Sequence, residues 1–241
     1  MNNSEHIWNA SADIFEMILK HPFIVEMIEG TLSTEKFSFY VAQDRMYLRD
    51  YSRALSFLAA RAPEMTVTNM FARHVANATN VEASLHGRLV KDFRINTEAY
   101  RPSPSLVAYK NFLLAMTSSE SFHIGLASRA YTDFLIAMTS SEPFHVGLAA
   151  VLPCYWIYRE VGRYAIRRMK EDNPYILWAE VYSGSAYGSS VQEVLDYIDS
   201  LSLSERELEE MKETYRIGAF YEYEFWDSAY RMETWPVSIL K

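Results

Sequence analysis

The sequence predicts an all-α fold, a bundle of long helices, and three observations lead to this prediction. Apolar residues recur at three- and four-residue steps through most of the chain, and no stretch alternates convincingly with period two. Only 8 Gly and 8 Pro interrupt the 241 residues. A chain of this length can bury a sizeable core, and we expect residues 1–241 to form a single all-α domain.

The first helix is expected to be amphipathic, with an apolar face formed by Ile7, Ala10, Ile14, Met17 and Ile18. His21-Pro22 interrupts it, because proline cannot continue a helix interior. A short helix over 23–28 follows, and Gly30 is expected to stop it.

Two long helices come next. Ser33 is expected to cap a helix that carries Glu35 in its first turn and extends to about Arg61. Another long helix is expected from about Met65 to Phe93, and Pro102 and Pro104 mark the connection after it.

Three further helices are expected after residue 145. The longest apolar run, over 146–158, is too short for a membrane span and predicts a buried core helix. Asn173-Pro174 is expected to start a helix that ends near Gly184, with Gly188 in the following loop. The final helix is expected to begin near Ser204 and to continue to about Met232.

A tandem duplication interrupts the bundle pattern. Residues 108–127 read AYKNFLLAMTSSESFHIGLA and residues 130–149 read AYTDFLIAMTSSEPFHVGLA, with fifteen of twenty positions identical. Each copy contains a helix end, a Thr-Ser-Ser-Glu turn and a helix start. Since one extra helix would reverse the direction of an antiparallel bundle, the chain must loop the extra helix out, lengthen a helix or exchange elements with a partner. The sequence leaves these three solutions open.

Composition excludes several functional classes. A net charge of −8 without a basic patch argues against a nucleic-acid partner. No apolar signal segment follows the polar first residues, and no run is long enough to cross a membrane. A single cysteine excludes an internal disulfide framework and fits a reducing compartment, so we expect a cytoplasmic protein.

That cysteine, Cys154, lies in the apolar run, directly after Pro153 and among Tyr155, Trp156 and Tyr158. A buried thiol among aromatic rings is either an inert small hydrophobe or a nucleophile that faces a flat, partly apolar substrate. The inert role is the commoner one for an isolated cysteine. The acidic residues of two other helices make the nucleophile worth considering.

Two carboxylates are candidates for ligand binding or proton transfer beside such a thiol. Asp44 shares one helix face with Tyr47 and Tyr51, where an acid is either paired to a basic neighbour or directed at a ligand. In the last helix, Glu222 shares its face with aromatic residues, whereas Glu224 lies about 200° around the helix on a charged face. We expect Glu222 to be the inward acid, with a raised pKa that suits proton transfer near neutral pH.

The duplication also creates two Glu-x-x-His motifs, Glu120 with His123 and Glu142 with His145. Di-metal carboxylate bundles use such pairs, so a di-metal oxidase is an alternative function. However, the second pair exists because the segment was copied, and an acid in a helical first turn needs no metal to explain it. We expect no metal and no cofactor, since no phosphate loop or dinucleotide motif is present either.

The chain resembles the TenA/thiaminase II family. The matching stretches, in family order, are HPFIVEMIEGTL, FYVAQDRMYLRDYSRAL, LAAVLPCYWIYREVG, NPYILWAEVYSG and FYEYEFWDSAYRMETW. The resemblance implies a haem-oxygenase-like all-α fold, a homotetramer, and hydrolysis of 4-amino-5-aminomethyl-2-methylpyrimidine, and of thiamin in many members less efficiently, in thiamin salvage. It places this chain in the cysteine-containing subgroup.

The resemblance also implies roles for individual residues. Cys154 takes the nucleophile position, Glu222 the proton-transfer position, and Asp44 the position that hydrogen-bonds the aminopyrimidine. The residues at ring-binding positions are Tyr47, Tyr131, Tyr182 and Phe225. Tyr109 is the duplicate of Tyr131 and competes with it; Tyr131 is favoured because its copy runs without interruption into Cys154.

The implied mechanism is nucleophilic addition of the Cys154 thiolate to the pyrimidine ring, with Glu222 protonating a ring nitrogen. A third possibility, beside this enzyme and the di-metal oxidase, is a non-catalytic pyrimidine-binding or regulatory protein whose pocket the duplication has spoiled.

Overall fold

The computed structural model describes residues 1–117 and 143–236, and within them every regular element is helical, which confirms the all-α prediction. In chain order the elements are α1 (Asn3–Asn9), α2 (Ala12–Lys20), α3 (Pro22–Glu29), α4 (Thr34–Arg61), α5 (Met65–Val81), the π-helix η1 (Glu82–His86), α6 (Gly87–Asp92), the 3-10 helix η2 (Thr97–Ala99), α7 (Pro104–Thr117), α9 (Phe144–Ile166), α10 (Ile176–Ser183), α11 (Ser185–Ser200) and α12 (Glu205–Arg231).

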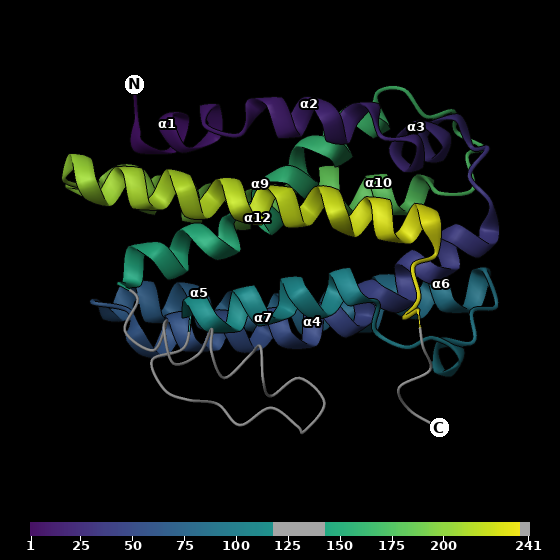
Figure 1. Cartoon of the computed structure of the whole chain (residues 1–241), viewed down its shortest axis with the longest axis horizontal. Helices are drawn as coiled ribbons and strands as arrows, with labels where there is room; N and C mark the ends of the chain where they lie inside the picture. Colours follow the sequence, from purple (N-terminus) through teal and green to yellow (C-terminus); the bar gives the residue numbers. More distant parts are fainter. Residues whose placement is uncertain (118–142, 237–241) are drawn as a thin grey trace.

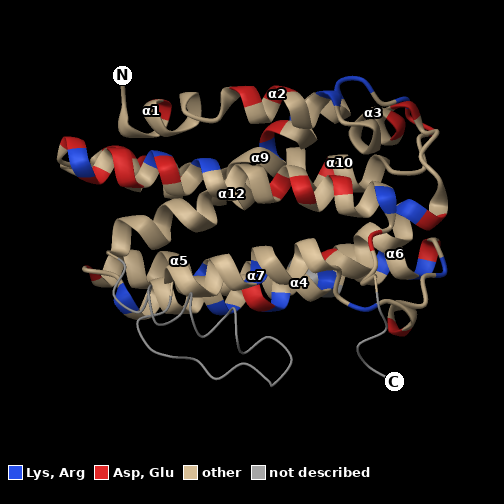
Figure 2. Cartoon of the chain, viewed as in Figure 1, with Lys and Arg blue, Asp and Glu red and all other residues tan. Residues whose placement is uncertain are grey.

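Two helix layers enclose the core (Figure 1). Helices α4, α5 and α7 pack side by side in one layer, and α9, α10 and α12 form the other. Helices α1, α2 and α3 lie along the outer side of α12. Acidic and basic residues are interspersed along α12 (Figure 2). Among the described residues, no helix is both long and apolar enough to cross a membrane.

The amino-terminal segment differs from the single helix that its apolar pattern predicts. It forms α1 and α2, with a break at Ala10 and Ser11. Ile7, Ile14 and Ile18 are buried as expected, but Met17 is half exposed. Ser11 at the break has a non-helical φ of −133°, so the helical face extrapolated from α1 does not continue unchanged.

Local capping chemistry confirms three predicted helix boundaries. Gly30 adopts a left-handed φ of 76° after α3, a conformation that glycine reaches without a Cβ penalty. The Ser33 hydroxyl accepts a hydrogen bond from the Lys36 amide at the start of α4. Ser204 forms a capping box with Glu207 at the start of α12.

The helix expected over 65–93 forms in three parts, because a π-helical turn separates α5 from α6. Such turns hold one more residue per turn than an α-helix and are frequent at functional sites. Here η1 ends at His86, a buried histidine that faces α4.

The described parts of the duplication belong to two different copies. α7 contains the first half of the first copy, and α9 begins with the last six residues of the second copy. The two ends touch: a Cβ at Gly147 would lie 2.8 Å from the Met116 carbonyl oxygen and 3.5 Å from Thr117 Cα. α9 starts after Pro143 without an acidic residue in its first turn, later than the Ser-Ser-Glu cap that the sequence suggests. The apolar run over 146–158 is buried within α9, as predicted.

The prediction of a loop at Gly188 is wrong. Gly188 lies within α11, where it packs near Arg163. Apolar burial by Val191, Val194 and Ile198 stabilises this helix and outweighs the low helix propensity of one glycine.

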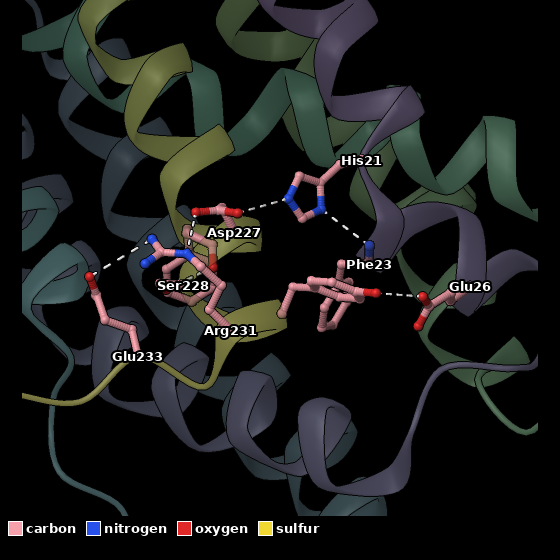
Figure 3. Close-up of polar contacts among 9 residues, drawn as sticks. His21, Phe23, Glu26, Asp227, Ser228, Arg231 and Glu233 are labelled. Atoms are coloured by element: carbon pink, nitrogen blue, oxygen red, sulfur yellow. Dashed lines mark hydrogen bonds and ion pairs between the residues drawn. The ribbon is translucent and has the colours of Figure 1, made fainter.

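The carboxyl-terminal part of α12 is fixed against α3 by a polar cluster (Figure 3). His21 Nδ1 accepts a hydrogen bond from the Phe23 amide, and its Nε2 lies 3.4 Å from Asp227 Oδ1. Asp227 also accepts a 2.6 Å hydrogen bond from Arg231. One turn before this cluster, α12 presents Glu222 and Phe225 to the core.

Candidate active site

Helix α9 carries Cys154 into the core, where its side chain is 8 % exposed. The preceding residue, Pro153, lies inside the helix and contacts α12 at Gly218. A Cβ at Gly218 would lie 2.7 Å from Pro153 Cγ, closer than atoms can pack. The glycine therefore permits the close approach that holds the thiol beside α12.

Helix α4 supplies Asp44 and Tyr47, both 2 % exposed. Asp44 Oδ2 lies 2.9 Å from His86 Nε2, so the acid is hydrogen-bonded to a histidine from η1. The sequence left open whether Asp44 meets a basic neighbour or a ligand. The structure shows the neighbour, and this bond occupies one of the two carboxylate oxygens.

Helix α12 supplies Glu222, which is 1 % exposed, whereas Glu224 lies partly in solvent; the predicted inward and outward orientations are confirmed. Tyr109 of α7 donates a 2.6 Å hydrogen bond to Glu222 Oε1. Burial raises the pKa of Glu222 to about 8, and the nearby Asp44 carboxylate adds to the rise, against the opposing effect of the Tyr109 hydrogen bond. A carboxyl with such a pKa holds its proton at neutral pH and can donate it.

Electrostatic coupling joins the thiol and the two acids. Burial raises the pKa of the Cys154 thiol well above its ordinary value, and a negative charge on Glu222 or on Asp44 raises it further. The hydroxyls of Tyr47 and Tyr51 oppose this rise, because they can hydrogen-bond the thiolate. Helices α4, α9 and α12 thus bring a sulfur and two acids into one buried cluster.

Aromatic side chains surround this cluster. The Tyr47 ring lies 5.0 Å from that of Tyr109 and 5.8 Å from that of Phe225. Tyr182 of α10 is also buried and packs 4.9 Å from the Tyr158 ring of α9. The Tyr47 hydroxyl is buried and lies near the Cys154 thiol. Flat apolar walls with a hydroxyl among them suit a planar ligand that has polar edges.

Tyr131 lies outside the described residues, so its predicted place is untested. Its duplicate Tyr109 is the tyrosine that contacts Glu222. Of the alternative metal ligands, Glu120, His123 and Glu142 also lie outside the described residues. His145 is described, and its Nε2 lies 2.9 Å from Glu210 of α12.

His86 is the site residue that sequence reasoning missed. It is one of two histidines in the helical stretch predicted over 65–93, it lies 42 positions from Asp44, and no spacing rule relates it to that residue. Its only local signal would have been the π-turn, which apolar periodicity does not reveal.

Two surface cavities, of about 780 Å³ and about 440 Å³, lie away from this cluster. The larger is lined by polar residues around His145 and Glu210, and the smaller by Trp8, Trp156 and neighbouring arginines. Neither is lined by Cys154, Asp44 or Glu222. We place the candidate site at the buried cluster, because a nucleophile, an acid with a raised pKa and a hydrogen-bonded carboxylate meet there.

Comparison with known proteins gives a consistent family match. The model of the TENA/THI-4/PQQC family matches residues 8–129 and 118–232, and the two matches overlap within the duplicated region. The aminopyrimidine aminohydrolase of Bacillus subtilis (strain 168) is 32% identical, over 100% of this chain and 95% of the relative. The thiamine biosynthesis multifunctional protein ThiED of Corynebacterium efficiens is 33% identical over 93% of this chain but only 28% of its own length.

Solved structures share the fold. A TenA homologue from P. horikoshii OT3 has a TM-score of 0.78 at 25% identity, covering 96% of this chain and 99% of the other. A domain with a heme oxygenase-like fold from Shewanella denitrificans has a TM-score of 0.64 at 10% identity, covering 96% and 93% of the two chains. The second likeness confirms the predicted haem-oxygenase-like architecture.

Proposed function

The chain belongs to the TENA/THI-4/PQQC family, and on this premise we propose that it hydrolyses 4-amino-5-aminomethyl-2-methylpyrimidine to the hydroxymethylpyrimidine in thiamin salvage. It is an aminopyrimidine aminohydrolase, of the thiaminase II type. The observation that carries the proposal is the buried Glu222 carboxyl, which accepts a 2.6 Å hydrogen bond from Tyr109 and whose pKa burial raises to about 8, in the same core region as Cys154 and Asp44.

The reaction needs these three groups because a 4-aminopyrimidine resists direct displacement at its 5-methylene carbon. The Cys154 thiol passes its proton to the substrate amine and adds as a thiolate to C6 of the ring, while Glu222 gives its proton to a ring nitrogen. The enamine so formed breaks the bond to the protonated amine, which leaves as ammonia. The oxygen of a water molecule then bonds to the exocyclic methylene. The C6–S bond breaks as Glu222 takes back the ring-nitrogen proton, which restores the aromatic ring, and the proton released by the water re-forms the thiol.

The other residues bind and orient the substrate. Asp44 accepts a hydrogen bond from the 4-amino group, and its fixed position sets which ring carbon faces the thiol. Tyr47, Phe225 and Tyr182 enclose the ring with apolar surface. The hydroxyl of Tyr47 stabilises the thiolate as it forms, because it favours the charged form of Cys154, whereas the Tyr51 hydroxyl donates to the Val151 carbonyl. We assign to Tyr109 the role that the sequence favoured for Tyr131, since Tyr109 holds Glu222.

Ammonia release from the aminomethylpyrimidine tests the proposal. Wild-type protein should release ammonia, and Cys154→Ser should lose at least about 10³-fold in kcat, since it removes the nucleophile. Alkylation of the only cysteine should abolish turnover as well. Normal turnover by Cys154→Ser would show that the covalent role is wrong, and absence of ammonia release by wild-type protein would favour the non-catalytic pyrimidine-binding alternative.

The proposal extends to assembly and compartment. We propose that residues 1–241 fold as one domain, that four copies form a homotetramer, and that the protein works in the cytoplasm, where its single thiol stays reduced. Light scattering should give about four times the 27.9 kDa chain mass. A monomer at micromolar concentration would contradict the assembly.

A further inference from the structure

The hydrogen bond between His86 and Asp44 is buried at both ends. His86 is 1 % exposed and Asp44 is 2 % exposed, and Nε2 lies 2.9 Å from Oδ2. Buried hydrogen bonds to a carboxylate are short, directional and costly to break. This one fixes the Asp44 side chain through Oδ2.

The other ring nitrogen of His86 indicates which proton the imidazole carries. Nδ1 is buried, and no side chain described in 1–80, 84–117 and 143–236 hydrogen-bonds it. A buried N–H without an acceptor is more costly than a buried lone pair, so we assign the proton to Nε2. Nε2 is therefore the donor and Asp44 Oδ2 the acceptor of this hydrogen bond.

The backbone around His86 is adapted to this contact. The π-turn η1 ends at His86 and packs against α4, between helices α5 and α6 that are otherwise regular. A single π-turn changes the direction in which the following side chains leave the helix. The turn thus directs a buried histidine to Asp44.

On the basis of the proposed function, we propose that His86 is a positioning residue that makes the enzyme select 4-amino over 4-oxo pyrimidines. A 4-amino group offers a hydrogen to a carboxylate, whereas a 4-oxo ring offers an oxygen at that position and a hydrogen on the adjacent ring nitrogen. A carboxylate that is free to turn can follow the hydrogen to the adjacent position. A carboxylate held by His86 cannot, so it rejects the 4-oxo ring.

Calorimetric binding of two ligands tests this inference without turnover. The ligands are 4-amino-5-hydroxymethyl-2-methylpyrimidine and its 4-oxo analogue, and the measured quantity is the ratio of their dissociation constants. His86→Leu should reduce the preference for the amino ligand at least about tenfold. His86→Gln should retain it within about threefold, because a glutamine amide can donate from nearly the same place as Nε2.

His74 provides a matched control. It is also a buried histidine, 3 % exposed, and its Nδ1 lies 2.9 Å from the Tyr155 hydroxyl. His74→Leu should lower stability yet leave the ligand preference unchanged. The inference is overturned if His86→Leu keeps the wild-type preference, if His74→Leu loses as much of it, or if wild-type protein binds neither ligand.

The two proposals fail separately. Wild-type protein that binds the amino ligand selectively but releases no ammonia would end the proposed function and leave the role of His86 intact. Normal turnover by wild-type protein, together with an unchanged ligand preference in His86→Leu, would support the proposed function and end the proposed role of His86.

Discussion

At the scale of single residues, Glu222 shows how burial converts an ordinary carboxyl into an acid that works near neutral pH. The folded protein holds its proton up to about pH 8, whereas the unfolded chain releases it near 4.5. Between these values only the unfolded state loses the proton, so this residue makes the folded protein less stable as the pH rises. Below 4.5 both states are protonated, and the effect disappears.

Glu222→Gln should therefore stabilise the protein, by up to about 4 kcal/mol at pH 9 and by almost nothing at pH 4. The amide keeps an oxygen for the Tyr109 hydrogen bond and cannot ionise. Urea unfolding across this pH range measures the effect. Glu224→Gln, at a partly exposed position on the same helix, should change the pH dependence much less. Parallel curves for Glu222→Gln and wild type would show that Glu222 is ionised in the folded state.

The two duplicate tyrosines give a second residue-scale prediction. Tyr109→Phe removes the hydroxyl that holds Glu222 and should lower kcat about tenfold or more. Tyr131→Phe is the matched control from the other copy and should stay within about twofold of wild type. If Tyr131→Phe is the damaging variant, the second copy supplies the site and the first does not.

At the scale of elements, the contact between α9 and α12 sets the distance between the thiol and the acid. Gly218→Ala would place a Cβ 2.7 Å from the Pro153 ring, so the helices must separate. We expect a loss of about 1–3 kcal/mol in unfolding free energy together with a lower kcat. Gly188→Ala, within α11 and clear of close contacts, should instead be neutral or stabilise by up to about 1 kcal/mol. Equal thermal stabilities for the two variants would refute this account of the interface.

The duplication gives a prediction about α7 and α9. Because Gly147 already packs on Met116 and Thr117, a short connection can join the two helices. Deleting residues 118–139 leaves one copy and links Thr117 to Ser140, so the variant should fold and keep near-normal ammonia release. Deleting residues 108–129 also leaves one copy but removes Lys110, which pairs with Asp50, so this variant should be slightly less stable. Unfolding of the first variant would mean that the intervening residues are needed.

The elements also show where sequence reasoning works. Gly30, Ser33 and Ser204 predicted their helix boundaries, because capping depends on neighbouring atoms alone. Gly188 misled the prediction, since the packing of α11 overrides local propensity. The break after α1 was not predicted, because the apolar spacing of the sequence continues across it.

At the scale of the whole molecule, the candidate active site forms from segments that are far apart in the sequence. The aromatic context of Cys154 and the inward face of Glu222 are visible in the sequence, and the family resemblance supplied their roles. The contact of His86 with Asp44 and the choice of Tyr109 are long-range consequences of packing and of the duplicated segment. No local pattern encodes either of them.

The most direct test of whether Cys154, Asp44 and Glu222 share one substrate site is a crystal structure with 4-amino-5-hydroxymethyl-2-methylpyrimidine bound. We expect ring carbon C6 to face Cys154 Sγ, the 4-amino group to donate to Asp44, and a ring nitrogen to meet Glu222. A ligand bound in either surface cavity, or those three side chains directed into separate parts of the molecule, would contradict the account.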